Sequence, residues 1–119
     1  DHNLKKIIKI IHKEISKKMI VFLKKNINKK IIVLDIQLLL ENKLNKENDV
    51  LVFVHSKKSD ISKNLKKRDN FNKKLYRKFK IIQLPLDYKK KQSNFIIKNK
   101  FTKKSVKSAV TEILKQIKC

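Results

Sequence analysis

The sequence predicts an α/β fold in which helices alternate with the strands of a mostly parallel sheet. Two short runs, 31–36 and 49–54, are almost wholly apolar and rich in β-branched residues, a pattern typical of strands buried on both faces. The segments around these runs carry apolar residues at helical spacing. Hydrophobic residues make up 40% of the 119 residues, enough for the core of a single domain and too many for wholesale disorder.

The first half of the chain is expected to contain one long helix and both of these strands. The helix covers residues 4 to about 25, and lysines occupy its outer face. Its predicted inner face consists of Leu4, Ile8, Ile11, Ile15, Met19 and Phe22. A polar break at 26–30 precedes the first strand, and residues 37–48 connect it to the second.

The second half is expected to be mostly helical. Ser59 or Asp60 would cap a helix that runs to about residue 69, and a second basic helix covers about 72–83. Pro85 marks a turn before another short helix at 86–92. Residues 95–97 form a third strand, and Thr102 caps a final helix whose inner face is Val106, Ala109, Val110, Ile113, Leu114 and Ile117. Lysine is densest over 63–91, which suggests a helical excursion from the sheet.

The net charge of +23 favours an anionic ligand without naming one. Lys, Ile and Asn dominate the chain, and their codons consist almost wholly of A and T, so biased base composition explains much of the charge. The alternative is a small basic RNA-binding protein. Such proteins rely on Arg forks and stacked aromatic rings, whereas only Arg68 and Arg77 among the 33 basic residues are arginines, and Trp is absent.

Several classes of site are excluded by composition. The chain has no glycine, so it contains no glycine-rich phosphate loop. One cysteine, Cys119, allows neither an internal disulfide nor a cysteine metal cage, and the three histidines lack ligand spacing. No apolar run is long enough to cross a membrane, and the start does not resemble a signal peptide. A cytoplasmic location is therefore expected.

Two positions carry chemistry that the rest of the chain does not. Asp35 lies near the carboxyl end of a predicted strand, where ligands bind in open α/β sheets, and Glu41 follows a run of three leucines. Asp35 would hold a Mg²⁺-bound water or a substrate hydroxyl, or else cap the loop. Arg68 survives in a chain that otherwise uses Lys, which indicates a need for the planar guanidinium; the alternative is an ion pair with Asp69.

The same residues carry a resemblance to the dephospho-CoA kinase family. Residues 35–41 (DIQLLLE) resemble its "D-hydrophobic-P-L-L-F-E" segment, and residues 49–54 resemble the strand that follows. Arg68 and Asp69 resemble the "R-D" at the start of its lid. Nearer the end of the chain, the "Q, K, A-D-x-x-I-x-N" stretch is matched by Gln83, Lys89 and residues 94–99, and near the start the "I-H-P" segment is matched by Ile11 and His12.

The resemblance implies a P-loop kinase fold, with a three-layer parallel sheet and a helical lid over about 63–92. It implies transfer of the γ-phosphoryl group of ATP, bound with Mg²⁺, to the ribose 3′-hydroxyl of dephospho-CoA. Arg68 would clamp the ATP phosphates as the lid closes, with Lys89 as a second phosphate ligand, and Asn99 would lie at the adenine pocket. Four residues would border the acceptor site: Asp35, Leu38, Leu39 and Glu41. ATP and dephospho-CoA are then the expected partners, with neither membrane nor specific nucleic acid.

The chain also departs from the family pattern. Gln37 replaces a proline, Asn64 stands where a first lid arginine is often found, and the glycine-rich phosphate loop is missing. We therefore expect residues 1–119 to be the C-terminal part of one kinase domain, inactive alone. The missing strand would lie between 31–36 and 49–54, so these strands would keep unpaired edges or pair with each other. Another nucleotide or nucleoside kinase of the same fold is an alternative.

Overall fold

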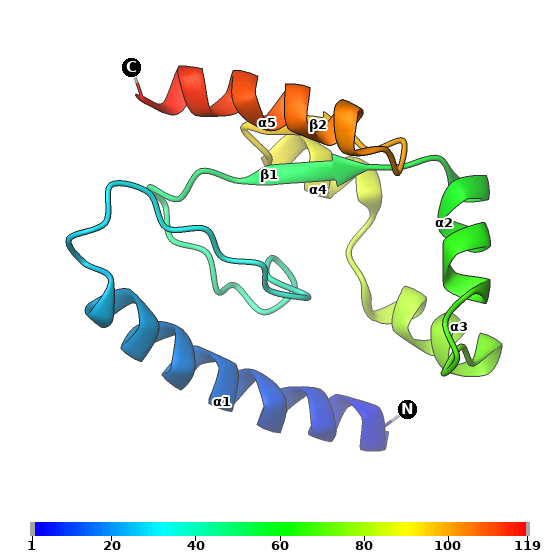
Figure 1. Cartoon of the computed structure of the whole chain (residues 1–119). Coiled ribbons are helices and arrows are strands. Elements are labelled where there is room, and N and C mark those ends of the chain that lie inside the picture. The colour runs from blue at the N-terminus through cyan, green and yellow to red at the C-terminus, as the bar shows by residue number, and fades with distance from the viewer. Residues whose placement is uncertain (1, 119) are drawn as a thin grey trace. The chain divides into compact units, whose positions relative to one another are not determined.

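The computed structural model describes residues 2–118, so Cys119 lies outside the described part. In chain order, its elements are α1 (His2–Lys25), β1 (Val52–His55), α2 (Lys58–Lys66), α3 (Lys73–Ile82), α4 (Leu86–Gln92), β2 (Phe95–Lys98) and α5 (Lys103–Lys118) (Figure 1). These elements fall into two compact units, residues 1–46 and 47–119, each of which is described by itself. Within the described residues, no helix has the combination of length and apolar character needed to span a bilayer.

The first unit consists of α1 and a non-helical segment that follows it. The predicted helix is confirmed, and four of its predicted inner residues are partly buried: Leu4, Ile8, Ile15 and Met19. Ile11 and Phe22 were wrongly placed on that face, since they are 49% and 45% exposed. His12 is buried instead, because it lies one turn after Ile8 and so projects from the same side of the helix.

Residues 31–36 do not form the predicted strand. They have no regular secondary structure and make no strand pairing within the part of the chain that the structure describes. Val33 is 80% exposed, so the apolar run is not buried on both faces either. A strand exists only where a neighbour satisfies its backbone N–H and C=O groups, and that requirement is not visible in the composition of the run itself.

The second unit contains a two-stranded parallel sheet made by β1 and β2. Val52 pairs with Phe95, and the register continues to His55 and Lys98. The parallel direction is confirmed, but the strand predicted over 49–54 begins only at Val52. Such a sheet is compatible with an incomplete α/β fold; a three-layer sheet is not formed by the described residues.

Asn94 determines where this pairing begins. Its side-chain Oδ1 accepts a hydrogen bond of 2.8 Å from the backbone N–H of Leu51. The carbonyl of Leu51 in turn accepts from the N–H groups of Asn94 and Phe95, at 2.8 and 3.1 Å. The amide side chain therefore completes the backbone hydrogen bonding at the residue before β1, where the regular ladder stops.

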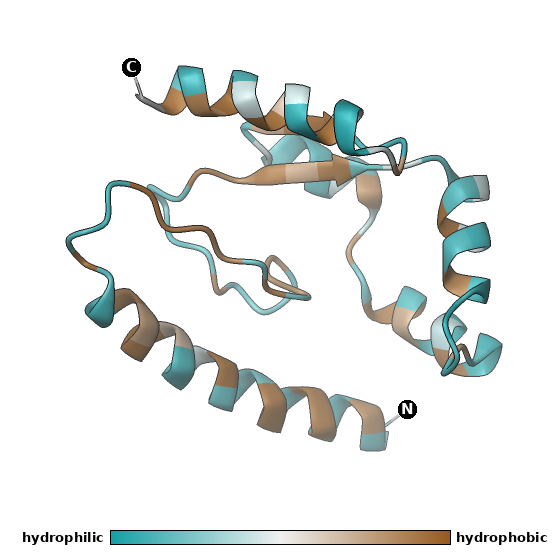
Figure 2. Cartoon of the chain, viewed as in Figure 1, coloured by the Kyte–Doolittle hydropathy of each residue, from teal (hydrophilic) through white to brown (hydrophobic). Residues whose placement is uncertain are grey.

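Helix α5 packs against β2 and covers its central residue. Ile97 is 7% exposed, and among the described residues it is the one apolar residue that is buried. The predicted inner face of α5 is partly buried at Val106, Ala109, Ile113 and Leu114, although Val110 and Ile117 are more exposed. Figure 2 shows this apolar side of α5 turned toward the sheet. The predicted cap is confirmed, because Thr102 Oγ1 accepts from the N–H of Ser105 at 3.3 Å.

Three short helices, α2 to α4, connect the two strands (Figure 1). Neither Ser59 nor Asp60 caps α2, whose N-cap is Lys57 without a side-chain hydrogen bond. Asp60 lies in the first turn, where its charge interacts favourably with the positive end of the helix dipole. Asn72 caps α3 by accepting from the N–H of Leu75 at 3.0 Å, and Pro85 precedes α4 as predicted.

We expect Ile97 to contribute more to stability than its neighbour Ile96, which is 47% exposed. Ile97→Ala should lower the free energy of unfolding by about 2–4 kcal/mol, because it removes buried methyl groups and leaves a cavity under α5. Ile96→Ala is the matched control and should cost less than about 1 kcal/mol. Urea denaturation followed by circular dichroism measures both, and equal losses would contradict the packing of α5 on β2.

Candidate functional site

Residues 37–43, here called the leucine turn, form a compact hydrogen-bonded loop in the first unit. The N–H of Asn42 donates to the carbonyl of Leu38 at 3.1 Å, and the N–H of Lys43 donates to that of Leu40 at 3.2 Å. Leu44 closes the loop by donating to the carbonyl of Leu39 at 3.1 Å. These bonds fold the run of three leucines back on itself.

Two residues of the leucine turn have left-handed backbone conformations without being glycine. The φ angles of Leu38 and Lys43 are 55° and 52°. A residue with a Cβ atom costs roughly 1–2 kcal/mol in this region, because the Cβ approaches a carbonyl oxygen. Other interactions of the turn must therefore compensate for this strain.

The side chain of Asn42 supplies one such interaction and joins the turn to α1. Its Nδ2 donates to the carbonyl of Leu38 at 2.9 Å and lies 3.0 Å from Nε2 of His12. His12 Nδ1 is buried and has no hydrogen-bond partner in the described part of the chain. A buried polar group in that state costs about 1–3 kcal/mol. In the sequence, His12 was noted only because it matches the "I-H-P" segment. Nothing in the sequence indicated its contact with Asn42.

The residues predicted to border the acceptor site lie in or just before this turn. Leu38, Leu39 and Glu41 are partly buried, and Asp35 is exposed in the segment before the turn. Glu41 is already engaged in a further interaction. The described residues contain no group of three or more His, Cys, Asp or Glu side chains that could hold a metal ion.

Asn99 lies at the carboxyl end of the sheet in the second unit. Its backbone N–H donates to the carbonyl of His55 at 2.8 Å, which extends the pairing past the last ladder residues. Its side-chain Oδ1 accepts from the N–H of Phe101 at 2.8 Å and so holds a turn in which Phe101 has a φ of 58°. The Nδ2 group of Asn99 is not used by this turn and can donate to a ligand.

Arg68 lies in the turn between α2 and α3. Its carbonyl accepts from the N–H of Phe71 at 3.0 Å, and its side chain is exposed. The alternative ion pair with Asp69 is not formed in the residues that the structure covers. Helix α2, which leads away from β1 (Figure 1), has nine residues and is roughly 14 Å long, and Arg68 follows its far end.

The predicted ATP ligands of the second unit lie on different segments of the chain. Arg68 lies beyond α2, Asn99 follows β2, and Lys89 is a partly buried residue of α4 that already has an interaction partner. The structure places each of them on a separate element. The predicted acceptor residues, in contrast, come from one short segment.

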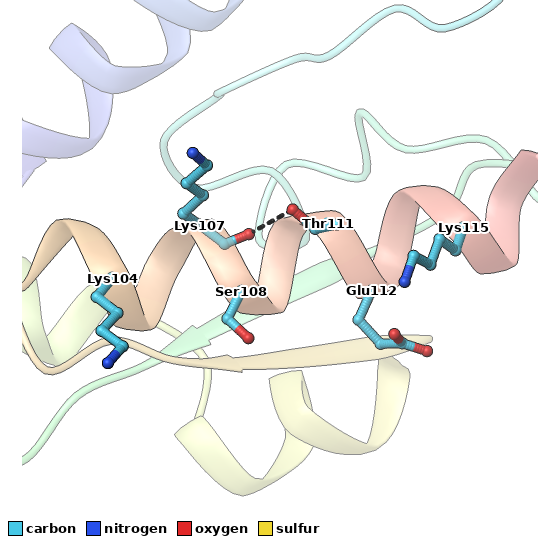
Figure 3. Close-up of a pocket in the computed structure, with 6 residues that line it drawn as sticks. All are labelled: Lys104, Lys107, Ser108, Thr111, Glu112 and Lys115. Carbon is cyan, nitrogen blue, oxygen red and sulfur yellow. Dashed lines mark hydrogen bonds between the residues drawn. The ribbon is translucent and has the colours of Figure 1, made fainter.

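A surface depression of about 470 Å³ lies elsewhere, along α5. Figure 3 shows its lining residues, Lys104, Lys107, Ser108, Thr111, Glu112 and Lys115. The Thr111 hydroxyl donates to the carbonyl of Lys107 at 2.8 Å, an ordinary bond within a helix. None of the predicted site residues lines this depression, which is an open lysine-rich face of one helix.

Comparisons with known proteins agree on one family. The family model described as dephospho-CoA kinase matches residues 1–105. A curated relative, the dephospho-CoA kinase of Wolbachia pipientis wMel, is 37% identical over 82 residues. That match covers 69% of this chain and 42% of the relative, so the shared region spans less than half of the relative's length. No solved structure matches the chain significantly.

Substitutions of Lys43 test whether its positive φ strains the leucine turn, because its side chain is exposed and adds little packing. Lys43→Gly should raise the free energy of unfolding by up to about 1 kcal/mol, since glycine adopts a positive φ without penalty. Lys43→Val should lower it by about 1 kcal/mol or more. Lys13→Gly, in the middle of α1, is the control and should be destabilising by about 1 kcal/mol. Thermal unfolding ranks the variants; a destabilising Lys43→Gly would argue against the left-handed turn.

Proposed function

Since the chain belongs to the dephospho-CoA kinase family, we propose that it takes part in transferring the γ-phosphoryl group of ATP to the ribose 3′-hydroxyl of dephospho-CoA, the last step of coenzyme A synthesis. The observation that carries this proposal is the family match over residues 1–105, which includes both the leucine turn and Arg68. The match covers 42% of the relative, so the activity of the whole protein is proposed as well.

On the acceptor side, the proposed contacts are Asp35 and three residues of the leucine turn, Leu38, Leu39 and Glu41. Leu38 and Leu39 offer a partly buried apolar surface, and Glu41 lies directly after them. Asp35 has an exposed carboxylate that can accept a hydrogen bond from an acceptor hydroxyl. Its place in the segment before the turn keeps it within a few residues of the apolar surface. Together these groups would orient the acceptor.

On the ATP side, Arg68 is the proposed catalytic residue. Phosphoryl transfer depends on positioning and on neutralising charge that spreads over the phosphate oxygens. An exposed guanidinium that is not paired with Asp69 can donate a two-pronged hydrogen bond to those oxygens when the lid, residues 63–92, closes. Lys89 is proposed as a second phosphate ligand and Asn99, through Nδ2, as a contact for the adenine ring.

The remaining parts of such a site do not come from the described residues. Mg²⁺ is usually held by one or two carboxylates together with the substrate phosphates, and no step is assigned to it here. The 119 residues contain no glycine, so a glycine-rich loop around the ATP phosphates would be formed by other residues. RNA binding receives no support from the comparisons, although the net charge of +23 attracts anions in general. A cytoplasmic location remains a prediction.

Substrate preference tests the proposed reaction. The complete gene product that contains these 119 residues should form ADP from ATP when dephospho-CoA is added, and much more slowly with nucleoside monophosphates. The 119 residues alone should show no turnover, because a phosphate loop is lacking. A coupled ADP assay measures both. Equal rates with nucleoside monophosphates would favour another kinase of the same fold, and salt-sensitive RNA binding without turnover would favour an RNA-binding protein.

The role of Arg68 is tested by comparison with Arg77, an exposed arginine of the same lid. In the complete gene product, Arg68→Ala should lower kcat by roughly 100-fold, because a donor to the transition-state charge is lost. Arg68→Lys should recover only part of the rate, since Lys keeps the charge but not the fork. Arg77→Ala should stay within about twofold of the unmodified protein. Similar losses for both arginines would indicate a general effect of charge.

A further inference from the structure

Among the described residues, His12 is the one polar residue that is buried, with 9% of its surface exposed. It is not one of the proposed ATP or acceptor ligands. Its partly buried neighbours on the same face of α1 are Ile8, Ile15 and Ser16, of which only Ser16 is polar. Burial of an imidazole on such a face calls for a hydrogen-bond partner. The partner is Asn42, which follows His12 by 30 residues.

The direction of this hydrogen bond follows from the second contact of the Asn42 amide. Nδ2 also lies 2.9 Å from the carbonyl oxygen of Leu38, which can only accept. Turning the amide over would place two carbonyl oxygens against each other, so the nitrogen must face both Leu38 and His12. Nε2 of His12 is therefore the acceptor. A ring that accepts at Nε2 carries its proton on Nδ1.

This contact is the long-range member of the hydrogen bonds that shape the leucine turn. The backbone bonds of the turn join residues no more than five positions apart, from Leu38–Asn42 to Leu39–Leu44. The Leu38 carbonyl receives two bonds from Asn42, one from the backbone and one from the side chain. Because Leu38 has a φ of 55°, its carbonyl orientation depends on these donors. The hydrogen bond that His12 Nε2 accepts from Asn42 Nδ2 holds the Asn42 side chain in place.

We propose that His12 and Asn42 are positioning residues: the neutral His12 ring holds the Asn42 amide, which holds the Leu38 carbonyl and so sets how Leu38, Leu39 and Glu41 face the acceptor. Only the identity of the acceptor rests on the proposed function. The chain of hydrogen bonds from α1 to the leucine turn is a property of residues 1–46 and can be tested without a ligand.

The first experiment reads the histidine tautomer and the amides of the turn in the 119-residue chain. Long-range proton–nitrogen correlation spectra of His12 should show the form protonated at Nδ1. Hydrogen exchange at Asn42, Lys43 and Leu44 should become about five- to tenfold faster in His12→Asn, whose side chain is too short to reach Asn42. His12→Gln should restore slow exchange, because its carbonyl can accept at the position of Nε2.

The matched control is His2→Asn, which changes an exposed histidine of the same helix and should leave exchange unchanged. A His12 ring protonated at Nε2 in the unmodified chain would overturn the proposal, even if every variant folded poorly. Equal exchange in His12→Gln and His12→Asn would overturn it as well, since the acceptor atom would then not matter.

The second experiment titrates dephospho-CoA into the same variants. His12→Asn and Asn42→Ala should each weaken binding about five- to tenfold, and His12→Gln should stay within about twofold of the unmodified chain. Unchanged binding in all variants would overturn the positioning role. Absence of binding by the unmodified chain would contradict the acceptor site of the proposed function, whereas the tautomer and the exchange rates would still decide the role of His12 and Asn42.

Discussion

Backbone hydrogen bonding between β1 and β2 is the interaction on which the second unit depends. Each strand contributes only four residues, and their parallel register gives α5 a surface on which to pack. Ile97 becomes buried because it is central in β2 and covered by α5. The Asn94 side chain extends the pairing to Leu51, and the Asn99 backbone extends it beyond His55. The second unit therefore has a very small sheet, on which α5 packs.

The same constraint explains why the first unit has no strand. Residues 31–36 have the composition of a buried strand but find no backbone partner among the described residues, and several of their side chains stay exposed. Order in this unit comes instead from α1 and from side-chain hydrogen bonds to the leucine turn. One amide, that of Asn42, connects the two. Such a unit has few cooperative contacts, so single polar groups have large effects on its shape.

The two halves of the proposed reaction differ in how complete they are. The proposed acceptor residues are close in sequence, and local hydrogen bonds give the leucine turn a defined shape. The proposed ATP ligands lie on different segments of the second unit, and Arg68 follows α2. Phosphoryl transfer needs these charges gathered around one phosphate chain. Closure of the lid and a phosphate loop from other residues are therefore essential parts of the proposed function.

Local sequence determined the helices, the parallel direction of the sheet and the family. Helical periodicity predicted α1 and α5, and the Thr102 cap and the Pro85 break were correctly predicted, because these features depend on residues a few positions apart. Tertiary structure decided that 31–36 is not a strand and that β1 starts at Val52, since pairing requires a distant segment. It also decided the burial of His12, its contact with Asn42 and the position of Arg68 after α2. Composition cannot show which distant backbone or side-chain group will be near enough to accept a hydrogen bond.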